Sequence, residues 1–322
     1  MNNQPLISII IPCKSIDKYY VKECIEKCRQ LEYKNYEIIL LPDEESYEDI
    51  EGVKVIPTGP ITPGAKRNIG VSNSKGEICA FIDSDAYPRK DWLNNAIKYF
   101  KDPEVAAVGG PGLTPREDSF MQKASGFVLS SFMVGNLSKR YKSKGSFESD
   151  DIHSCNFLVR RDVLIDIGGW NEKYWPGEDT LICRAIKRAG KKMIEASDVV
   201  VYHHRRPLFE KHLKQVASYG LHRGFFARKF KENSLKIQYF MPSSLILFGF
   251  AGSVLSFINE ILLLIFIVGL ISYLILCLLA SIIEVKNRDL RMICVVWLGI
   301  ILTHLCYGIS FLNGLFRRDL KR

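Results

Sequence analysis

The chain has 322 residues, 47% of them hydrophobic, and a formal net charge of +9. Its length allows one large domain or two. Nine cysteines are scattered without a Cys-x-x-Cys pair, which speaks against a zinc site and favours free thiols in a reducing compartment. Residues 1–5 carry no positive charge, and the apolar run at 6–11 is too short for a signal helix, so we expect the first domain in the cytosol.

The first part of the chain alternates strand and helix patterns. Short apolar runs predict buried strands, and apolar residues at helical spacing between them predict amphipathic helices. Strands separated by single helices are typical of βαβ units, so we expect an α/β domain with a mostly parallel sheet. In chain order the pattern predicts a strand at 6–12, a helix at 21–31, strands at 36–41 and 53–56, a helix at 65–74 and a strand at 77–82.

Two carboxylates, Asp83 and Asp85, follow the last of these strands. Open α/β sheets bind ligands at the carboxyl ends of their strands. Mg²⁺ or Mn²⁺, held by one or two carboxylates plus substrate phosphate oxygens, suits such a place. Solvated turn acids are the alternative interpretation of this triplet taken alone.

A second group of functional candidates lies after residue 168. Beyond it we expect a helix at 178–190, whose first turn contains Glu178 and Asp179. Acids at this position commonly complement the helix dipole, but the neighbouring Trp170, Tyr174 and Trp175 favour an acceptor pocket in which aromatic faces stack on a sugar and a carboxylate acts as base. Ordinary core aromatics are the alternative. The remaining predicted elements are a helix at 92–100 and strands at 105–110, 156–160 and 199–203.

The end of the chain is basic and then apolar. Residues 205–236 contain nine Lys and Arg against two acids, with apolar residues at helical spacing. This pattern predicts an amphipathic helix region at 205–240 on an anionic cytoplasmic leaflet and disfavours nucleic-acid binding. Apolar runs at 242–283, interrupted at Asn259, and at 292–312 predict a membrane domain at 241–322 with a two-helix hairpin and a third segment.

The sequence does not decide how the chain beyond residue 240 crosses the membrane. Both the loop 284–291 and the tail 317–322 are basic, so three full spans would place one of them outside. Otherwise the last segment is re-entrant or interfacial.

The order of four motifs, at residues 9–12, 64–70, 81–86 and 177–179, resembles the inverting family-2 glycosyltransferases of the GT-A fold. The resemblance covers roughly residues 6–230, and the apolar tail looks most like the membrane-anchored exopolysaccharide-type members. It implies a GT-A catalytic domain at 1–204 with a Rossmann-like mixed sheet, and a metal-dependent hexosyl- or N-acetylhexosaminyltransferase.

The resemblance also implies roles for individual residues. Asp43 would read the nucleotide base, Asp83 would lie near the ribose and Asp85 would bind the metal; Asp179, beside Glu178, would be the catalytic base. Further candidates for binding the nucleotide sugar are Pro12, Lys66, Arg67 and Ser84. Lys66 and Arg67 would neutralise the diphosphate; the alternative is that they are solvated side chains at the start of a helix. His203 or His204 is a candidate for the metal shell or for a phosphate, against a purely structural role. Trp170, Trp175 and Gly177 are assigned to the acceptor pocket.

Two departures from the family pattern qualify the expected substrate. Residues 42–46 are more acidic and bulkier than usual after Asp43. A UDP-sugar is favoured, but the identity of the nucleotide base is therefore left open. Residues 215–219 lack the Gln-x-x-Arg-Trp motif of processive synthases, which predicts transfer of a single sugar.

We therefore expect a multi-pass plasma-membrane enzyme with a cytosolic catalytic domain, which moves one sugar from a nucleotide-diphosphate sugar to a hydroxyl of a lipid-linked glycan. Mn²⁺ or Mg²⁺ is the expected cofactor, and membrane lipids are expected partners. A polyprenyl-phosphate glycosyltransferase and a non-catalytic nucleotide-sugar-binding protein tethered to a membrane are the alternatives.

Overall fold

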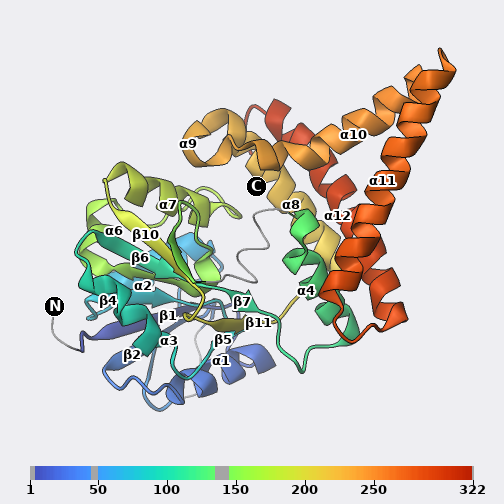
Figure 1. Ribbon diagram of the computed structural model, residues 1–322. Coiled ribbons are helices and arrows are strands. Elements are labelled where there is room, and N and C mark those ends of the chain that lie inside the picture. Colours follow the sequence, from blue (N-terminus) through green and yellow to red (C-terminus); the bar gives the residue numbers. More distant parts are fainter. Residues whose placement is uncertain (1–3, 45–49, 135–144, 321–322) are drawn as a thin grey trace. The chain divides into compact units, whose positions relative to one another are not determined.

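The computed structural model describes residues 4–44, 50–134 and 145–320. The chain divides into two compact units (Figure 1). Unit 1 contains residues 1–115 and 140–204, and unit 2 contains residues 116–139 and 205–322. Unit 1 ends at residue 204, whereas residues 116–139, which we expected within the catalytic domain, belong to unit 2; the domain at 1–204 stays a prediction.

Unit 1 is built on an eight-stranded mixed sheet with the order β3-β2-β1-β4-β9-β6-β10-β8. The strands from β3 to β4 pair in parallel, whereas β9 runs antiparallel to both of its neighbours. The predicted α/β fold with a mixed sheet is confirmed. The strands are β1 (Ile7–Pro12), β2 (Tyr36–Leu41), β3 (Val53–Val55), β4 (Ile78–Phe81), β6 (Val105–Gly109), β8 (Ser146–Glu148), β9 (Phe157–Arg160) and β10 (Lys192–Ala196).

Helices cover both faces of this sheet, which explains why its central strands are mostly apolar. Along β1, Ile9 and Ile11 belong to one buried cluster and Ile10 to another, since successive side chains of a strand point to opposite faces. Helices α1 (Tyr19–Arg29) and α3 (Trp92–Ile97) contribute to the first cluster. Helices α2 (Pro63–Ser72), α6 (Arg161–Asp166) and α7 (Glu178–Arg188) contribute to the second.

A small second sheet lies beside the end of β4. Its order is β5-β11-β7, from β5 (Ala86–Pro88), β11 (Val201–His203) and β7 (Gly112–Leu113). Strand β5 begins directly after the Asp83–Asp85 turn, and it pairs antiparallel with β11 so that Ala86 stands opposite His203. Two 3₁₀ helices, Tyr99–Lys101 and Ser154–Asn156, complete the elements of unit 1 described here.

Unit 2 is helical. Three of its helices are long and apolar enough to cross a membrane, judged by length and composition within the described residues. The break predicted at Asn259 is confirmed, because its side chain accepts a hydrogen bond from the amide of Ile261 and caps the following helix. The helices are α4 (Phe120–Ser130), α8 (Glu210–Lys229), α9 (Lys231–Ser234), α10 (Ile237–Leu255), α11 (Glu260–Glu284) and α12 (Leu290–Phe316), the last three being the candidate spans.

Helix α12 is one continuous helix of 27 residues, which argues against a re-entrant last segment. Helix α8 packs along α12. A Cβ added to Gly220 would lie 2.7 Å from the carbonyl oxygen of Tyr307, so the two backbones approach closely at this glycine. The apolar side of α8, including Val216 and Phe226, is buried. We expected this side to face a lipid surface; it faces protein instead, and membrane contact through the basic side stays a prediction.

Candidate active site

The candidate site lies at the carboxyl ends of β1, β2 and β4. Pro12 is the buried last residue of β1. After β4, the amide of Ala86 donates to the carbonyl of Asp83 at 3.0 Å and closes a tight turn. Asp83, Ser84 and Asp85 therefore leave the sheet partly exposed, although the strand before them is fully buried.

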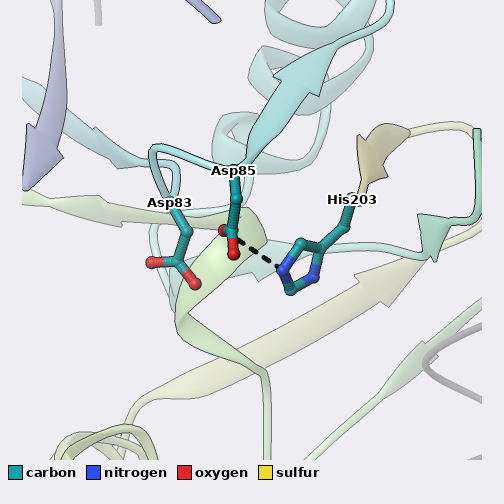
Figure 2. A group of neighbouring side chains, drawn as sticks. All are labelled: Asp83, Asp85 and His203. Carbon is teal, nitrogen blue, oxygen red and sulfur yellow. Dashed lines mark ion pairs between the residues drawn. The ribbon is translucent and has the colours of Figure 1, made fainter. Parts of the chain in front are cut away.

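Asp83, Asp85 and His203 form a cluster whose potential ligand atoms all lie within 4.8 Å of one another (Figure 2). Nε2 of His203 lies 3.2 Å from Oδ1 of Asp85. The pairing of β5 with β11 brings these residues together, although they are more than 100 positions apart in the chain. Burial disfavours a charge on His203, but Cys155 and the Asp85 carboxylate outweigh it and raise the pKa of His203 above its usual value.

The other candidate histidine, His204, points elsewhere. Its Nε2 lies 2.8 Å from Oε2 of Glu23, and its ring stacks on Tyr20. It is 6% exposed. Of the two candidates, therefore, only His203 joins the carboxylate cluster.

Arg67 connects the cluster to the second pair of acids. Its guanidinium donates to Oδ1 of Asp83 and to Oε1 of Glu178, both at 2.8 Å, and to Oγ of Ser154 at 3.1 Å. The side chain is 2% exposed and lies over the ring of Trp170. An arginine fork fits two carboxylates in this way and holds them at a fixed separation.

The structure separates Glu178 from Asp179. Gly177 precedes them with φ = 112°, a left-handed conformation that favours glycine. Glu178 is 4% exposed and paired with Arg67, whereas Asp179 is partly exposed. Burial and, to a smaller extent, the Asp179 carboxylate raise the pKa of Glu178 to about 7 against the lowering effect of Arg67. Asp179 is the more accessible carboxylate of the two.

Lys66 is buried next to the carboxyl end of β2. Its Nζ donates to the carbonyl oxygens of Cys13 and Leu41, at 2.8 and 3.0 Å, and lies 2.6 Å from Oδ1 of Asp43. These three contacts use all the donors of an ammonium group. The geometry therefore favours a role in holding Asp43 at the end of β2, and direct neutralisation of diphosphate stays a prediction. Glu45 and Ser46, which follow Asp43, lie outside the described residues.

The predicted aromatic pocket is corrected in part. Trp170 is 2% exposed and packs edge-on against Phe81 and Phe157, so it is a core residue and cannot stack on a sugar here. Trp175 is 47% exposed and precedes a cis-proline. It remains available to a ligand, next to the start of α7.

Asn68 was expected to fix the turn beside Lys66 and Arg67, but three sets of contacts at the site, its own among them, were not predicted. Ser154 contacts Arg67, and Cys155 contacts His203. Asn68 ties α2 to the loop before α7: its amide nitrogen donates to the carbonyl of Trp170 at 2.9 Å, and its amide oxygen accepts from the amide of Trp170 at 2.8 Å. The residues of each contact are about 50 positions or more apart in the chain, so no local sequence pattern reveals the contact.

Residues 8–168 match the profile described as "Glycosyl transferase family 2". The chain belongs to this family. A solved mannosyltransferase from Pyrobaculum calidifontis, in complex with GDP-Man and Mn²⁺, superposes with a TM-score of 0.67 over 99% of this glycosyltransferase and 89% of that chain, at 15% identity. The predicted GT-A fold is therefore confirmed.

Two curated relatives of this glycosyltransferase are archaeal. It is 25% identical over 274 residues to a dolichyl N-acetyl-α-D-glucosaminyl phosphate 3-β-D-2,3-diacetamido-2,3-dideoxy-β-D-glucuronosyltransferase of Methanococcus voltae, covering 78% of this chain and 81% of the relative. It is 22% identical over 218 residues to a glucosyl-dolichyl phosphate glucuronosyltransferase of Haloferax volcanii, covering 61% of this chain and 68% of the relative. Both names place a sugar already joined to dolichyl phosphate in the reaction.

Proposed function

We propose that this protein is a metal-dependent, inverting glycosyltransferase that moves one sugar from a nucleotide-diphosphate sugar to a hydroxyl group of a lipid-linked glycan. The observation that carries the proposal is the Asp83–Asp85–His203 cluster together with Arg67, which bonds Asp83 on one side and Glu178, the neighbour of Asp179, on the other. Arg67 thus links one carboxylate of the proposed cation site to the residue next to the proposed base.

The donor atoms of the cluster fit a divalent cation. Two carboxylates and one imidazole are ligands that suit Mn²⁺, and carboxylates also suit Mg²⁺. Asp85 and His203 would hold the ion, with Asp83 beside it. A bound divalent ion would offset the charge that develops on the leaving diphosphate.

Asp179 is the proposed general base. It is partly exposed at the start of α7 and is therefore accessible to an acceptor hydroxyl. Glu178 is buried and engaged by Arg67, so its role is to hold that arginine rather than to take the proton. Attack by the hydroxyl on the face opposite the leaving group inverts the anomeric centre. Trp175 is proposed to support the acceptor sugar by stacking.

Asp43 is proposed to contact the nucleotide base from the end of β2. A UDP-sugar is the favoured donor. Because the residues after Asp43 are unusually acidic, the identity of the nucleotide base has to be tested with other donors. Because the two archaeal relatives described above are named for a sugar joined to dolichyl phosphate, we propose a lipid-linked acceptor. The three candidate spans support a multi-pass protein of the plasma membrane, and we propose that unit 1 faces the cytosol.

The test is release of nucleoside diphosphate by detergent-solubilised full-length protein, supplied with UDP-, GDP- or dTDP-sugars, Mn²⁺ or Mg²⁺, and lipid-linked mono- or disaccharide acceptors. We expect turnover with one donor, loss of turnover with EDTA, and loss in Asp85→Asn. A polyprenyl phosphate without sugar should not act as acceptor. Absence of both turnover and donor binding across the panel would overturn the proposal.

A further inference from the structure

We propose that Cys155 is a positioning residue that fixes the ring and the tautomer of His203 through its sulfur atom, and that His153 anchors this sulfur from its other side. The inference rests on the proposed function, because it concerns how His203 is prepared to hold a divalent cation. Neither residue belongs to the carboxylate cluster itself.

The three residues surround Gly112 on β7. Cys155 is 3% exposed, in the 3₁₀ helix Ser154–Asn156. Its Sγ lies 2.7 Å from Nδ1 of His153, and it forms a side-chain hydrogen bond with His203. A Cβ added to Gly112 would lie 3.2 Å from Cε1 of His153, 3.5 Å from the sulfur and 3.7 Å from Cβ of His203. The rings of the two histidines and the sulfur are therefore packed around one point, where a side chain at Gly112 would press on the ring of His153.

The contact of His153 with the carbonyl of Gly110 sets the direction of the other hydrogen bonds. Nε2 of His153 lies 2.9 Å from the carbonyl oxygen of Gly110, which can only accept, so Nε2 carries the proton. In a neutral His153, Nδ1 is then an acceptor, and the thiol of Cys155 donates to it. The sulfur keeps its lone pairs for His203.

The tautomer of His203 is set by its partners in the same way. Nε2 of His203 faces Asp85, so Nδ1 is the nitrogen left for the sulfur. Nδ1–H donates to the sulfur, which is the arrangement that directs Nε2 toward the carboxylates as a metal ligand. Partners of the second ring nitrogen generally set the tautomer and orientation of metal-binding histidines. Here a thiol takes the place that a carboxylate or carbonyl usually has.

Loss of this contact would remove one restraint on the ring of His203. Rotation about the bond to an imidazole ring has broad energy minima, and β11 is a strand of only three residues. Cys155→Ala should therefore weaken Mn²⁺ binding by about 10-fold, the lower end of the effect seen for outer partners of metal ligands. Cys155→Ser, which keeps a donor and an acceptor, should restore most of the affinity.

The test is titration of the full-length protein in detergent with Mn²⁺, in which the electron paramagnetic resonance signal of free Mn²⁺ reports the dissociation constant. Cys79→Ala is the matched control, since Cys79 is also fully buried in unit 1 but pairs with Ser74. His153→Phe removes the anchor and should weaken binding as Cys155→Ala does. In turnover assays, the KM for Mn²⁺ should rise in Cys155→Ala while kcat at saturating Mn²⁺ is kept.

The outcomes separate the two proposals. If the wild type does not bind Mn²⁺ more tightly than Asp85→Asn, the metal site of the proposed function fails. If the wild type binds Mn²⁺ and Asp85→Asn does not, but Cys155→Ala and His153→Phe bind it as the wild type does, only the positioning role fails. Should Cys155→Ala not fold, the comparison of Cys155→Ser with His153→Phe decides: equal, wild-type affinity in both overturns the inference.

Discussion

Replacing Arg67 by methionine tests the central connection of the site. Methionine preserves much of the length of the side chain but removes its charge, so Glu178 is left buried without a cation. Breaking a buried ion pair from one side typically costs about 3–5 kcal/mol. Asp83, with a side chain 30% exposed, is partly compensated by water and should contribute less. For a unit of this size such a loss lowers the melting temperature by about 10 °C.

The loss should depend on pH in a definite direction. Arg67 lowers the pKa of Glu178, which burial raises to about 7. Without Arg67 this pKa rises further, so the folded state holds a proton that the unfolded state releases from about pH 4.3 upward. The wild type also holds this proton up to about pH 7, so the variant loses stability relative to the wild type only as pH rises above about 7, and the loss should be larger at pH 8 than at pH 5.

Tryptophan fluorescence during thermal unfolding is a suitable assay, because three of the four tryptophans lie in unit 1. A Trp297→Phe background removes the signal of the fourth, in α12. The double variant Arg67→Met/Glu178→Met, which removes both charges, should recover much of the loss. A loss below about 1 kcal/mol, the size of an ordinary substitution, or a loss of equal size at both pH values would refute this account of Arg67.

The remaining predictions concern the base, the aromatics and a buried histidine. Asp179→Asn should lower kcat by about 10²–10⁴-fold with donor binding kept; equal loss of donor affinity would contradict the assignment. Trp175→Ala should raise the acceptor KM without changing the melting temperature, whereas Trp170→Ala should cost about 3–5 kcal/mol of stability. The reverse pattern would show that Trp170, and not Trp175, contacts the acceptor. His212, between the hydroxyls of Ser125 and Thr303, has its pKa lowered to about 4 by burial. Because the unfolded state binds the proton first, stability should fall by about 3 kcal/mol between pH 6.5 and 4, and His212→Gln should flatten this dependence in a thermal-unfolding series.

Much of the strand order along the chain was predictable because buried strands leave apolar runs of the right length. The strand predicted at 36–41 matches β2 (Tyr36–Leu41). Strand β10 was missed, since Lys192–Ala196 mixes charged and apolar residues. The reversed direction of β9 depends on its pairing with β4 and β6, and no single segment encodes such a pairing.

Some residues of the candidate site could likewise be predicted from the sequence, and others could not. Asp83 and Asp85 follow an apolar run directly, so their position at a strand end could be predicted. The partner of Arg67 could not, because Glu178 is 111 positions away. Trp170 was assigned to a pocket because aromatic residues pattern alike in cores and in binding sites, and only its contacts with Phe81 and Phe157 distinguish the two.

The membership of residues 116–139 in unit 2 bears on how the protein can be dissected. The polypeptide passes between the units three times, near residues 115, 139 and 204. In α4, Ala124 and Val128 are buried in a cluster with residues of α11 and α12. A fragment ending at residue 204 would keep α4 and lose those partners, leaving an apolar helix uncovered and prone to self-association. A tractable soluble form would therefore need the stretch 116–139 replaced by a polar linker, as well as removal of the C-terminal helices.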